Sequence, residues 1–300
     1  MMLSKADTHV HTRFSGLGSL GPLRFPESVS DPKDVVRKAQ SMGFKVICIT
    51  DHNSITGAIK AREYAESIDD IEVVVGEEVS TTDGEVIGLF LEEEIPAGLS
   101  ARETISRIRA QGGLVIAPHP FSLHCPALGE MVDELDIDGI ETLNGGHIDG
   151  YANKTASERS NLSRWANLGG SDAHALSTIG DAYTVFEGET AEDLRKGILD
   201  RTTSVNGGAW RLEKAVHWSI GVVFTSDILI LKSMLGFIRE ADMHDDPIVH
   251  KISVLKTGKK LLALFGSILY LMPPIPFLCG ITGHQFLKRK AKIARAGRRK

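Results

Sequence analysis

The chain has 300 residues, of which 42% are hydrophobic and 24% are charged, so it can bury a sizeable core and is not broadly disordered. Its three cysteines, Cys48, Cys125 and Cys279, form no CxxC pair, which argues against a disulfide scaffold or a thiolate zinc site. The net charge of −5 conceals an asymmetry, because residues 251–300 contain Lys and Arg but no Asp or Glu. An acidic body suits carboxylates that bind metal, and a basic tail suits an anionic lipid or nucleic-acid partner.

Short apolar runs rich in Val and Ile alternate with helical patterns over residues 1–205. Runs that are apolar on both faces are typical of buried parallel strands. The expected strands are Ala6–His11, Lys45–Thr50, Ile71–Val79, Glu85–Leu91, Leu114–Pro118, Gly139–Leu143, Leu168–Ser171 and Ala182–Phe186. The expected helices between them begin at capping residues, and they are Asp31–Met42, Ser100–Gln111 and Thr190–Leu199. This alternation indicates an α/β barrel or a doubly wound sheet.

The pattern of apolar and polar residues changes after about Gly208, where long apolar stretches replace the alternation of strands and turns. We therefore expect two domains, residues 1–208 and residues 209–300. The second would be an apolar helical region that ends in the basic run from Lys288 onward.

Histidines and carboxylates follow the predicted strands in five places, and these residue types are the usual ligands of divalent metals in hydrolytic sites. His9 and His11 share one face of the first strand, because the side-chain period of a strand is two residues. The other clusters end their strands with His52, Glu78, His119 and the pair Asp172 and His174. Barrel active sites lie at this end of the strands, so we expect the clusters to converge.

These clusters resemble the motifs of the PHP superfamily, which is named for its polymerase and histidinol phosphatase members. The matching motifs are DTHVHT (7–12), TDHNS (50–54), GEEVS (76–80), APHP (117–120) and GSDAH (170–174). The resemblance covers roughly residues 1–205. It implies a distorted seven-stranded β/α barrel that binds two to three divalent ions, with Mn, Zn, Fe and Mg all open.

The resemblance also implies individual ligands for the first two ions. His9, His11 and Asp172 match the ligands of the first metal, and His119 matches a ligand of the second. Glu78 matches the bridging carboxylate of the family.

His52 and His174 resemble the pair that holds a third metal. Many members have an acidic residue or histidine shortly after the first motif, but this chain has Gly16, which offers no side-chain ligand. The third site is then completed by Asp31, Glu27 or the substrate, or it is lost.

A second departure lies at Glu85, which stands where the family often has a histidine. A carboxylate there would favour a harder ion such as Mn or Mg over Zn.

Asp7 and Asp51 lie beside ligand histidines and are expected to orient them. Arg13 follows the first motif and is a candidate phosphate clamp, with a surface arginine as the alternative. Glu141, Asn144 and His147 lie at the end of the predicted strand Gly139–Leu143 and are expected to line the pocket, with ordinary loop polarity as the alternative.

We expect hydrolysis of a phosphate ester by a metal-bridged hydroxide, with proton transfer assisted by His52, His174 or Asp172. The substrate class stays open among phosphorylated small molecules such as sugar phosphates, nucleotides and nucleic-acid ends. One alternative is a catalytically silent regulatory or binding module with the same fold. Another is a nucleic-acid-processing nuclease that uses the basic tail, although no nucleic-acid-binding motif supports it.

The C-terminal region leaves three interpretations open. Residues 261–281 contain no charge, but Pro273, Pro274 and Pro276 interrupt them, and the unbroken helix from Gly258 to Met272 is too short for a ~30 Å bilayer core. Membrane contact through residues 216–238 and 261–300 would be either an embedded hairpin or an interfacial attachment. The third interpretation is a soluble helical cap. Because the first residues lack an apolar run, we expect a cytoplasmic protein, free or on the cytoplasmic face of the membrane.

Overall fold

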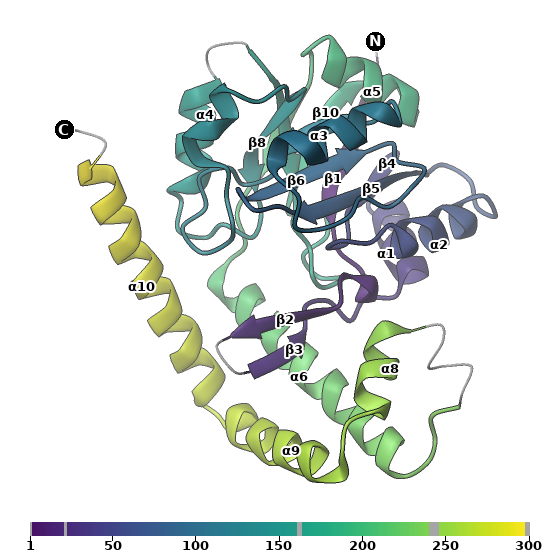
Figure 1. Cartoon of the computed structure of the whole chain (residues 1–300), viewed down its shortest axis with the longest axis vertical. Helices are drawn as coiled ribbons and strands as arrows, with labels where there is room; N and C mark the ends of the chain where they lie inside the picture. Colours follow the sequence, from purple (N-terminus) through teal and green to yellow (C-terminus); the bar gives the residue numbers. More distant parts are fainter. Residues whose placement is uncertain (1, 21–22, 161–163, 240–245, 298–300) are drawn as a thin grey trace.

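A nine-stranded mixed sheet curls into a barrel, and a separate group of helices lies below it in Figure 1. The computed structural model describes residues 2–20, 23–160, 164–239 and 246–297. The strand order in the sheet is β11-β10-β1-β4-β5-β6-β7-β8-β9. The strands are β1 (Leu3–Val10), β4 (Val46–Ile49), β5 (Glu72–Ser80), β6 (Glu85–Leu89), β7 (Leu114–Ala117), β8 (Gly139–Asn144), β9 (Ala166–Gly170), β10 (Ala182–Glu187) and β11 (Ser204–Gly207).

The eight strands expected from the apolar runs are confirmed, but the expectation that they are parallel is wrong at two of them, β6 and β10, and β10 is antiparallel to β1. The pairs β1–β4, β4–β5, β7–β8 and β8–β9 are parallel as predicted, whereas β6 is antiparallel to both β5 and β7. The physical reason at β6 is the short turn from Thr81 to Gly84, which Thr81 N–H closes by donating to the Gly84 carbonyl at 3.0 Å. So short a connection can join only antiparallel neighbours.

The barrel is nearly closed by contacts between its first and last strands. The His11 amide donates to the Ala173 carbonyl at 2.9 Å, and the Asp172 amide donates to the His9 carbonyl at 2.8 Å. Because the sheet runs through seven strands from β1 to β9, the predicted distorted seven-stranded barrel is confirmed. Strands β10 and β11 extend it beyond β1.

Helices and short 3₁₀ turns connect the strands. They are η1 (Arg13–Ser15), α1 (Pro32–Ser41), α2 (Thr56–Ala65), α3 (Ala101–Ala110), η2 (Gly129–Asp133), α4 (Ala152–Ser160) and α5 (Ala191–Leu199). The predicted helices α1, α3 and α5 begin where expected, because the side chains of Asp31, Ser100 and Thr190 accept backbone hydrogen bonds at their N-termini. A small hairpin, β2 (Leu17–Leu20) and β3 (Leu23–Pro26), lies below the barrel (Figure 1).

The C-terminal region consists of α6 (Leu212–Met234), α8 (Pro247–Ser253), α9 (Thr257–Leu271) and α10 (Ile275–Gly297). Helices α9 and α10 meet at a bend of 79° around the prolines, so the predicted interruption is confirmed. Among the described residues, α6 alone is long and apolar enough to cross a membrane as one helix, and α9 with α10 qualifies only as a bent pair. Residues 298–300, at the end of the predicted basic tail, lie outside the described residues.

The region beyond β11 is attached closely to the barrel. The Trp210 amide donates to the Gly145 carbonyl at 2.7 Å, and its indole donates to the Ser171 carbonyl at 3.0 Å. The Trp218 indole, on α6, donates to the Glu27 carbonyl at 3.1 Å. These bonds place the start of the C-terminal region beside the strand ends of the barrel. The domain division at residue 208 stays a prediction.

Candidate metal centre

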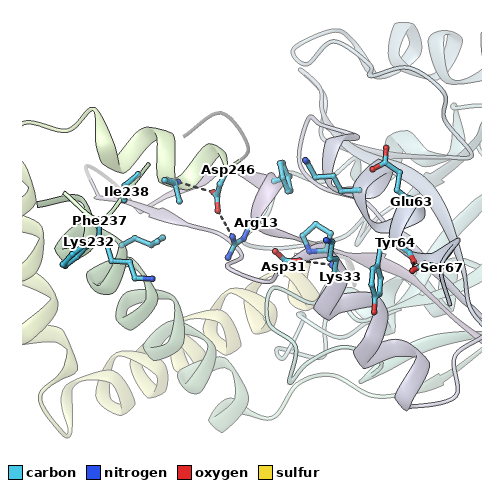
Figure 2. A pocket seen from close by; sticks show the side chains of 15 residues that line it. Arg13, Asp31, Lys33, Glu63, Tyr64, Ser67, Lys232, Phe237, Ile238 and Asp246 are labelled. Atoms are coloured by element: carbon cyan, nitrogen blue, oxygen red, sulfur yellow. Dashed lines mark hydrogen bonds and ion pairs between the residues drawn. The ribbon is translucent and has the colours of Figure 1, made fainter. Parts of the chain in front are cut away.

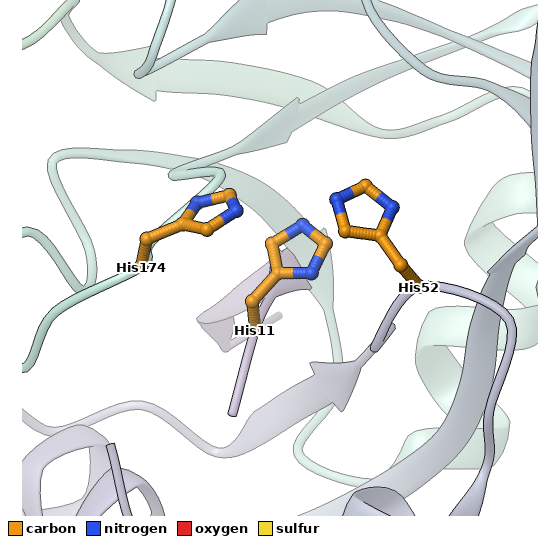
Figure 3. A group of neighbouring side chains, drawn as sticks. All are labelled: His11, His52 and His174. Carbon is orange, nitrogen blue, oxygen red and sulfur yellow. The ribbon is translucent and has the colours of Figure 1, made fainter. Parts of the chain in front are cut away.

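The chemistry-bearing side chains gather where the strands of the barrel end. His9 lies on β1 and His11 directly after it, while His52 follows β4 and His119 follows β7. Figure 3 shows the imidazoles of His11, His52 and His174 side by side, and the ring centroid of His11 lies 4.2 Å from that of His174 and 4.6 Å from that of His52. The parallel strands deliver these residues to one end of the barrel, as the strand arrangement predicts.

Glu78 on β5 lies at the centre of this group, and its carboxylate is buried. One oxygen, Oε1, lies 3.0 Å from His119 Nε2. The other, Oε2, lies 3.2 Å from His52 Nδ1 and 3.3 Å from both His9 Nε2 and His11 Nε2. A carboxylate that divides its two oxygens between separate histidines has the geometry of a bridging ligand.

Asp172 completes the opposite side of the group. Its Oδ1 lies 3.3 Å from His11 Nε2, 3.6 Å from His9 Nε2 and 3.5 Å from His174 Nδ1. Both Asp172 and His119 have left-handed backbone angles, with φ of 51° and 25°. Such angles are uncommon outside glycine and asparagine and often accompany functional sites, and here they direct both side chains into the pocket.

The tautomers of the first two histidines are set by neighbours outside the group. The Glu141 carboxylate lies 3.1 Å from His9 Nδ1 and accepts a hydrogen bond from its N–H. Ser15 Oγ donates to Asp51 at 2.7 Å, so it accepts from His11 Nδ1, which lies 3.0 Å away. When the two rings are neutral, both Nε2 atoms are thereby left with lone pairs, and these atoms lie 3.0 Å apart.

A cation fits between these atoms. Two nitrogen lone pairs facing each other at 3.0 Å repel, and a shared positive charge removes that repulsion. Burial opposes a charge on His11, but hydrogen bonds to Asp172 and Glu78 overcome it and raise its pKa to about 9. His119 behaves in the same way through Glu78, with a pKa also raised to about 9. The site therefore favours positive charge, which a proton or a divalent ion can supply.

The PHP domain family profile matches residues 7–124, and the PHP-associated family profile matches residues 150–203. A curated relative, the uncharacterized protein MJ1587 of Methanocaldococcus jannaschii, is 49% identical over 152 residues, which are 51% of this chain and 88% of the relative. This chain belongs to the PHP family.

Solved structures support the fold. A two-domain protein of Bacteroides vulgatus, described as containing a predicted PHP-like metal-dependent phosphoesterase, matches with a TM-score of 0.57 and 18% identity, over 69% of this chain and 65% of that chain. PsfC of Pseudomonas syringae matches with a TM-score of 0.52 and 17% identity, over 70% of this chain and 93% of that chain. At such identities the likeness concerns the PHP fold alone.

Among the described residues, four sets of side chains in this PHP site can each hold an ion, because their ligand atoms lie within 4.8 Å of one another, and one of the four is His52, Glu78 and Glu85. Of the other three, the first is His9, His11 and Asp172, and the second is His9, Glu78 and His119. The third is His11, His52 and His174. The structure thus brings together all the residues that the sequence predicted as metal ligands, and their role as ligands stays a prediction.

Glu85 also faces the group, with its Oε1 3.9 Å from His52 Nδ1 and its Oε2 3.8 Å from His119 Nε2. Burial and the negative charge of Glu78 raise the pKa of Glu85 to about 8, so the two carboxylates compete for the ionised form. A cation beside them would allow both to ionise, which fits an oxygen ligand at this position.

Glu27 is a candidate for the side-chain ligand that Gly16 does not offer, because its carboxylate lies beside His52. Its Oε2 lies 3.2 Å from His52 Nε2, although Glu27 is near the end of the β2–β3 hairpin and far from the first motif in sequence. Burial raises the pKa of Glu27 to about 7. Asp31, another alternative, instead caps α1 by accepting from the Lys33 amide.

Arg13, the predicted phosphate clamp, forms an ion pair with a carboxylate of the C-terminal region. Its Nη1 donates to Asp246 Oδ2 at 2.6 Å. Both residues line a pocket of about 790 Å³ between the barrel and the C-terminal helices (Figure 2). The lining of that pocket, which includes Asp31 and Lys232, contains none of the clustered histidines. A phosphate clamp at Arg13 stays a prediction that its contacts do not favour.

Asp7 and Asp51, which were expected to orient the ligand histidines, bond to backbone amides and hydroxyl groups and not to a histidine ring. Asp7 accepts from the amides of Ser171 and Gly180 at 2.9 Å each, and so joins β1 to the loop that carries Asp172. Asp51 accepts from the Thr12 hydroxyl at 2.6 Å and from Ser15. Sequence reasoning missed Ser15, whose only signal is its distance of four residues from His11.

The predicted pocket residues form a second layer on the far side of His119. His147 stacks on His119 with centroids 5.0 Å apart, and its Nδ1 lies 2.9 Å from Asn144 Oδ1. Asn144 Nδ2 donates to Glu141 at 2.8 Å and to Asp172 at 3.2 Å. This network fixes the carboxylates of Glu141 and Asp172, which both lie beside His9. The second layer therefore holds the side chains of the central group in position.

Proposed function

We propose that this PHP protein is a metal-dependent hydrolase of phosphate esters. The observation that carries the proposal is the pair of fixed Nε2 lone pairs of His9 and His11, which converge with Glu78 and Asp172 in a buried group. A purely structural cluster has no need to fix both tautomers so that two lone pairs meet. Divalent ions bound there would supply an activated water and neutralise charge on a phosphoryl group.

The residues of the chain have separate roles around that chemistry. Glu141 and Ser15 hold the rings of His9 and His11 in place through their Nδ1 atoms. His174 donates from Nδ1 to the Asp172 carbonyl at 2.9 Å, which leaves its Nε2 as an acceptor. Trp218 lies edge-on to the His174 ring, with centroids 5.9 Å apart.

Proton transfer has candidates at the rim of the group. Burial and the charge of His11 lower the pKa of His174 to about 3, so its Nε2 is unprotonated at neutral pH and suits metal binding better than proton uptake. Burial likewise lowers the pKa of His52 to about 4. Glu27, with a pKa of about 7, is the group suited to protonate a leaving oxygen.

The test is hydrolysis of p-nitrophenyl phosphate by the full chain, after chelation and after addition of Mn²⁺ or Zn²⁺. The proposal predicts loss of turnover on chelation and recovery with metal. Turnover that persists in protein shown to be free of metal would refute it. Metal uptake without turnover of aryl phosphate, nucleotides, sugar phosphates or phosphorylated DNA ends would instead indicate a silent binding module.

A further inference from the structure

Helices α6 and α9 pack antiparallel to each other, with their polar side chains on the inside of the pair. Ser219 Oγ lies 2.8 Å from the Tyr270 hydroxyl at one end. Lys260 Nζ donates to Ser233 Oγ at 2.8 Å at the other end. Between them, the Asp227 carboxylate is hydrogen-bonded to Ser267.

The outside of the same pair is apolar. On α9, large side chains recur at spacings of three and four residues, which places them on one face of the helix, and they are 45% to 70% exposed. These residues, here called the α9 face, are Leu261, Leu262, Phe265, Ile268, Leu269 and Met272. Among the described residues, the barrel exposes only Met2, Leu3 and Leu199 as large apolar side chains.

Positive charge lies beside the α9 face. Lys256 and Lys259 are exposed at the N-terminus of α9, and its first turn contains no acidic residue. Lysines at this end oppose the helix dipole, so they do not stabilise the helix itself. Residues 251–300 contain no Asp or Glu at all, so the surroundings of the α9 face complement an anionic surface.

The attachments of the region to the barrel indicate how a membrane would lie. At the start of α6, Lys214 Nζ pairs with Asp181 at 2.5 Å, and beyond its end Asp246 pairs with Arg13 at 2.6 Å. Both contacts are made with the same barrel, so a bilayer cannot pass between the two ends of α6. Lys290 on α10 likewise donates to the Leu123 carbonyl of the barrel at 3.1 Å.

We propose that the α9 face inserts into the surface of an anionic membrane, with α9 parallel to its plane and Lys256 and Lys259 against the lipid phosphates. Insertion removes the exposed apolar side chains from water without placing Asp227 or Lys260 in lipid, because Asp227 on α6 bonds to α9 and Lys260 on α9 bonds to α6. The barrel stays outside the bilayer, with its site near the surface.

The test is sedimentation of the full chain with phosphatidylcholine vesicles, with and without phosphatidylglycerol. The wild type is expected to bind anionic vesicles at least about tenfold more strongly than neutral ones. Leu262→Asp with Phe265→Asp should lower binding by about tenfold or more, because two charges enter the inserted face. The charge-matched control, Leu3→Asp with Leu199→Asp on the barrel, should bind like the wild type.

A second pair of variants tests the lysines. Lys256→Gln with Lys259→Gln should reduce the preference for anionic vesicles, whereas Lys33→Gln with Lys196→Gln on the barrel should not. Circular dichroism verifies that each variant is folded. Equal sedimentation of the α9-face variant and the wild type would overturn the proposal. So would light scattering that shows a dimer in solution which the α9-face variant converts to monomers, because the face would then be covered by a second copy.

Discussion

The barrel and the C-terminal helices distribute polarity in opposite ways. In the barrel, His9 and Glu78 are 0% and 1% exposed, and the interior at one end is a group of charged and ionisable side chains. In the C-terminal region, Phe265 is 62% exposed while Lys260 is 7% exposed. Burying ionisable groups is costly unless they are paired or bind metal, and exposing apolar groups is costly unless they meet a partner. This contrast underlies the two proposals, which assign an ion to one region and a lipid surface to the other.

The largest expected effect comes from removing the Glu78 carboxylate, the proposed bridging ligand. Glu78→Gln should lower metal-dependent turnover on the order of 10³-fold, since one neutral amide replaces the charge that four histidines share. Metal content and turnover of the purified chain are the measurements, with Glu66→Gln on the barrel surface as the control. Vesicle binding should be unchanged, and a parallel loss of both properties would contradict the separation of the two regions.

A smaller effect is expected for Glu141→Gln, which keeps the shape of the side chain. Because Glu141 fixes the tautomer of His9, its loss should weaken metal affinity by about 10–100-fold without removing a ligand. Calorimetric titration with Mn²⁺ measures this. If turnover at saturating metal fell as much as in Glu78→Gln, Glu141 would belong among the ligands instead.

Glu27→Gln tests whether Glu27 helps to bind the proposed third ion, which would lie beside His52. We expect the variant to bind one ion fewer, or to bind it about tenfold more weakly, because His52 Nε2 loses its carboxylate neighbour. Metal analysis after equilibrium dialysis checks this, with Asp31→Asn as the matched control because Asn also caps α1. Unchanged metal content together with slower turnover would place Glu27 in proton transfer only.

The smallest effect is expected at the contact between the two regions. Arg13→Ala and Asp246→Asn should each destabilise the attachment of α8 by about 1 kcal/mol, because both break the same ion pair. Urea unfolding of the single and double variants measures the coupling. A large rise in KM for Arg13→Ala alone would restore the phosphate-clamp interpretation.

Local signals in the sequence predicted the barrel and most of its site. Buried strands are short apolar runs, and the ligands follow them directly, so His9, His119 and Asp172 could be placed on strand ends without coordinates. The prediction of parallel direction went wrong at β6, because a tight turn at Gly84 carries less signal than an apolar run.

Contacts between distant segments could not be predicted. The approach of Glu27 to His52 depends on the β2–β3 hairpin, and the ion pair of Arg13 with Asp246 depends on how α8 packs. The hydrogen bond between Asp227 and Ser267 likewise depends on α6 and α9 lying side by side.

The most direct test of the central claim is an anomalous-scattering map from crystals of the full chain grown with Mn²⁺. The account predicts peaks bounded by His9, His11 and Asp172, and by Glu78 and His119, with both Nε2 atoms of the first motif directed at them. The same side chains in the same positions, with no anomalous peak among them at saturating Mn²⁺, would contradict it.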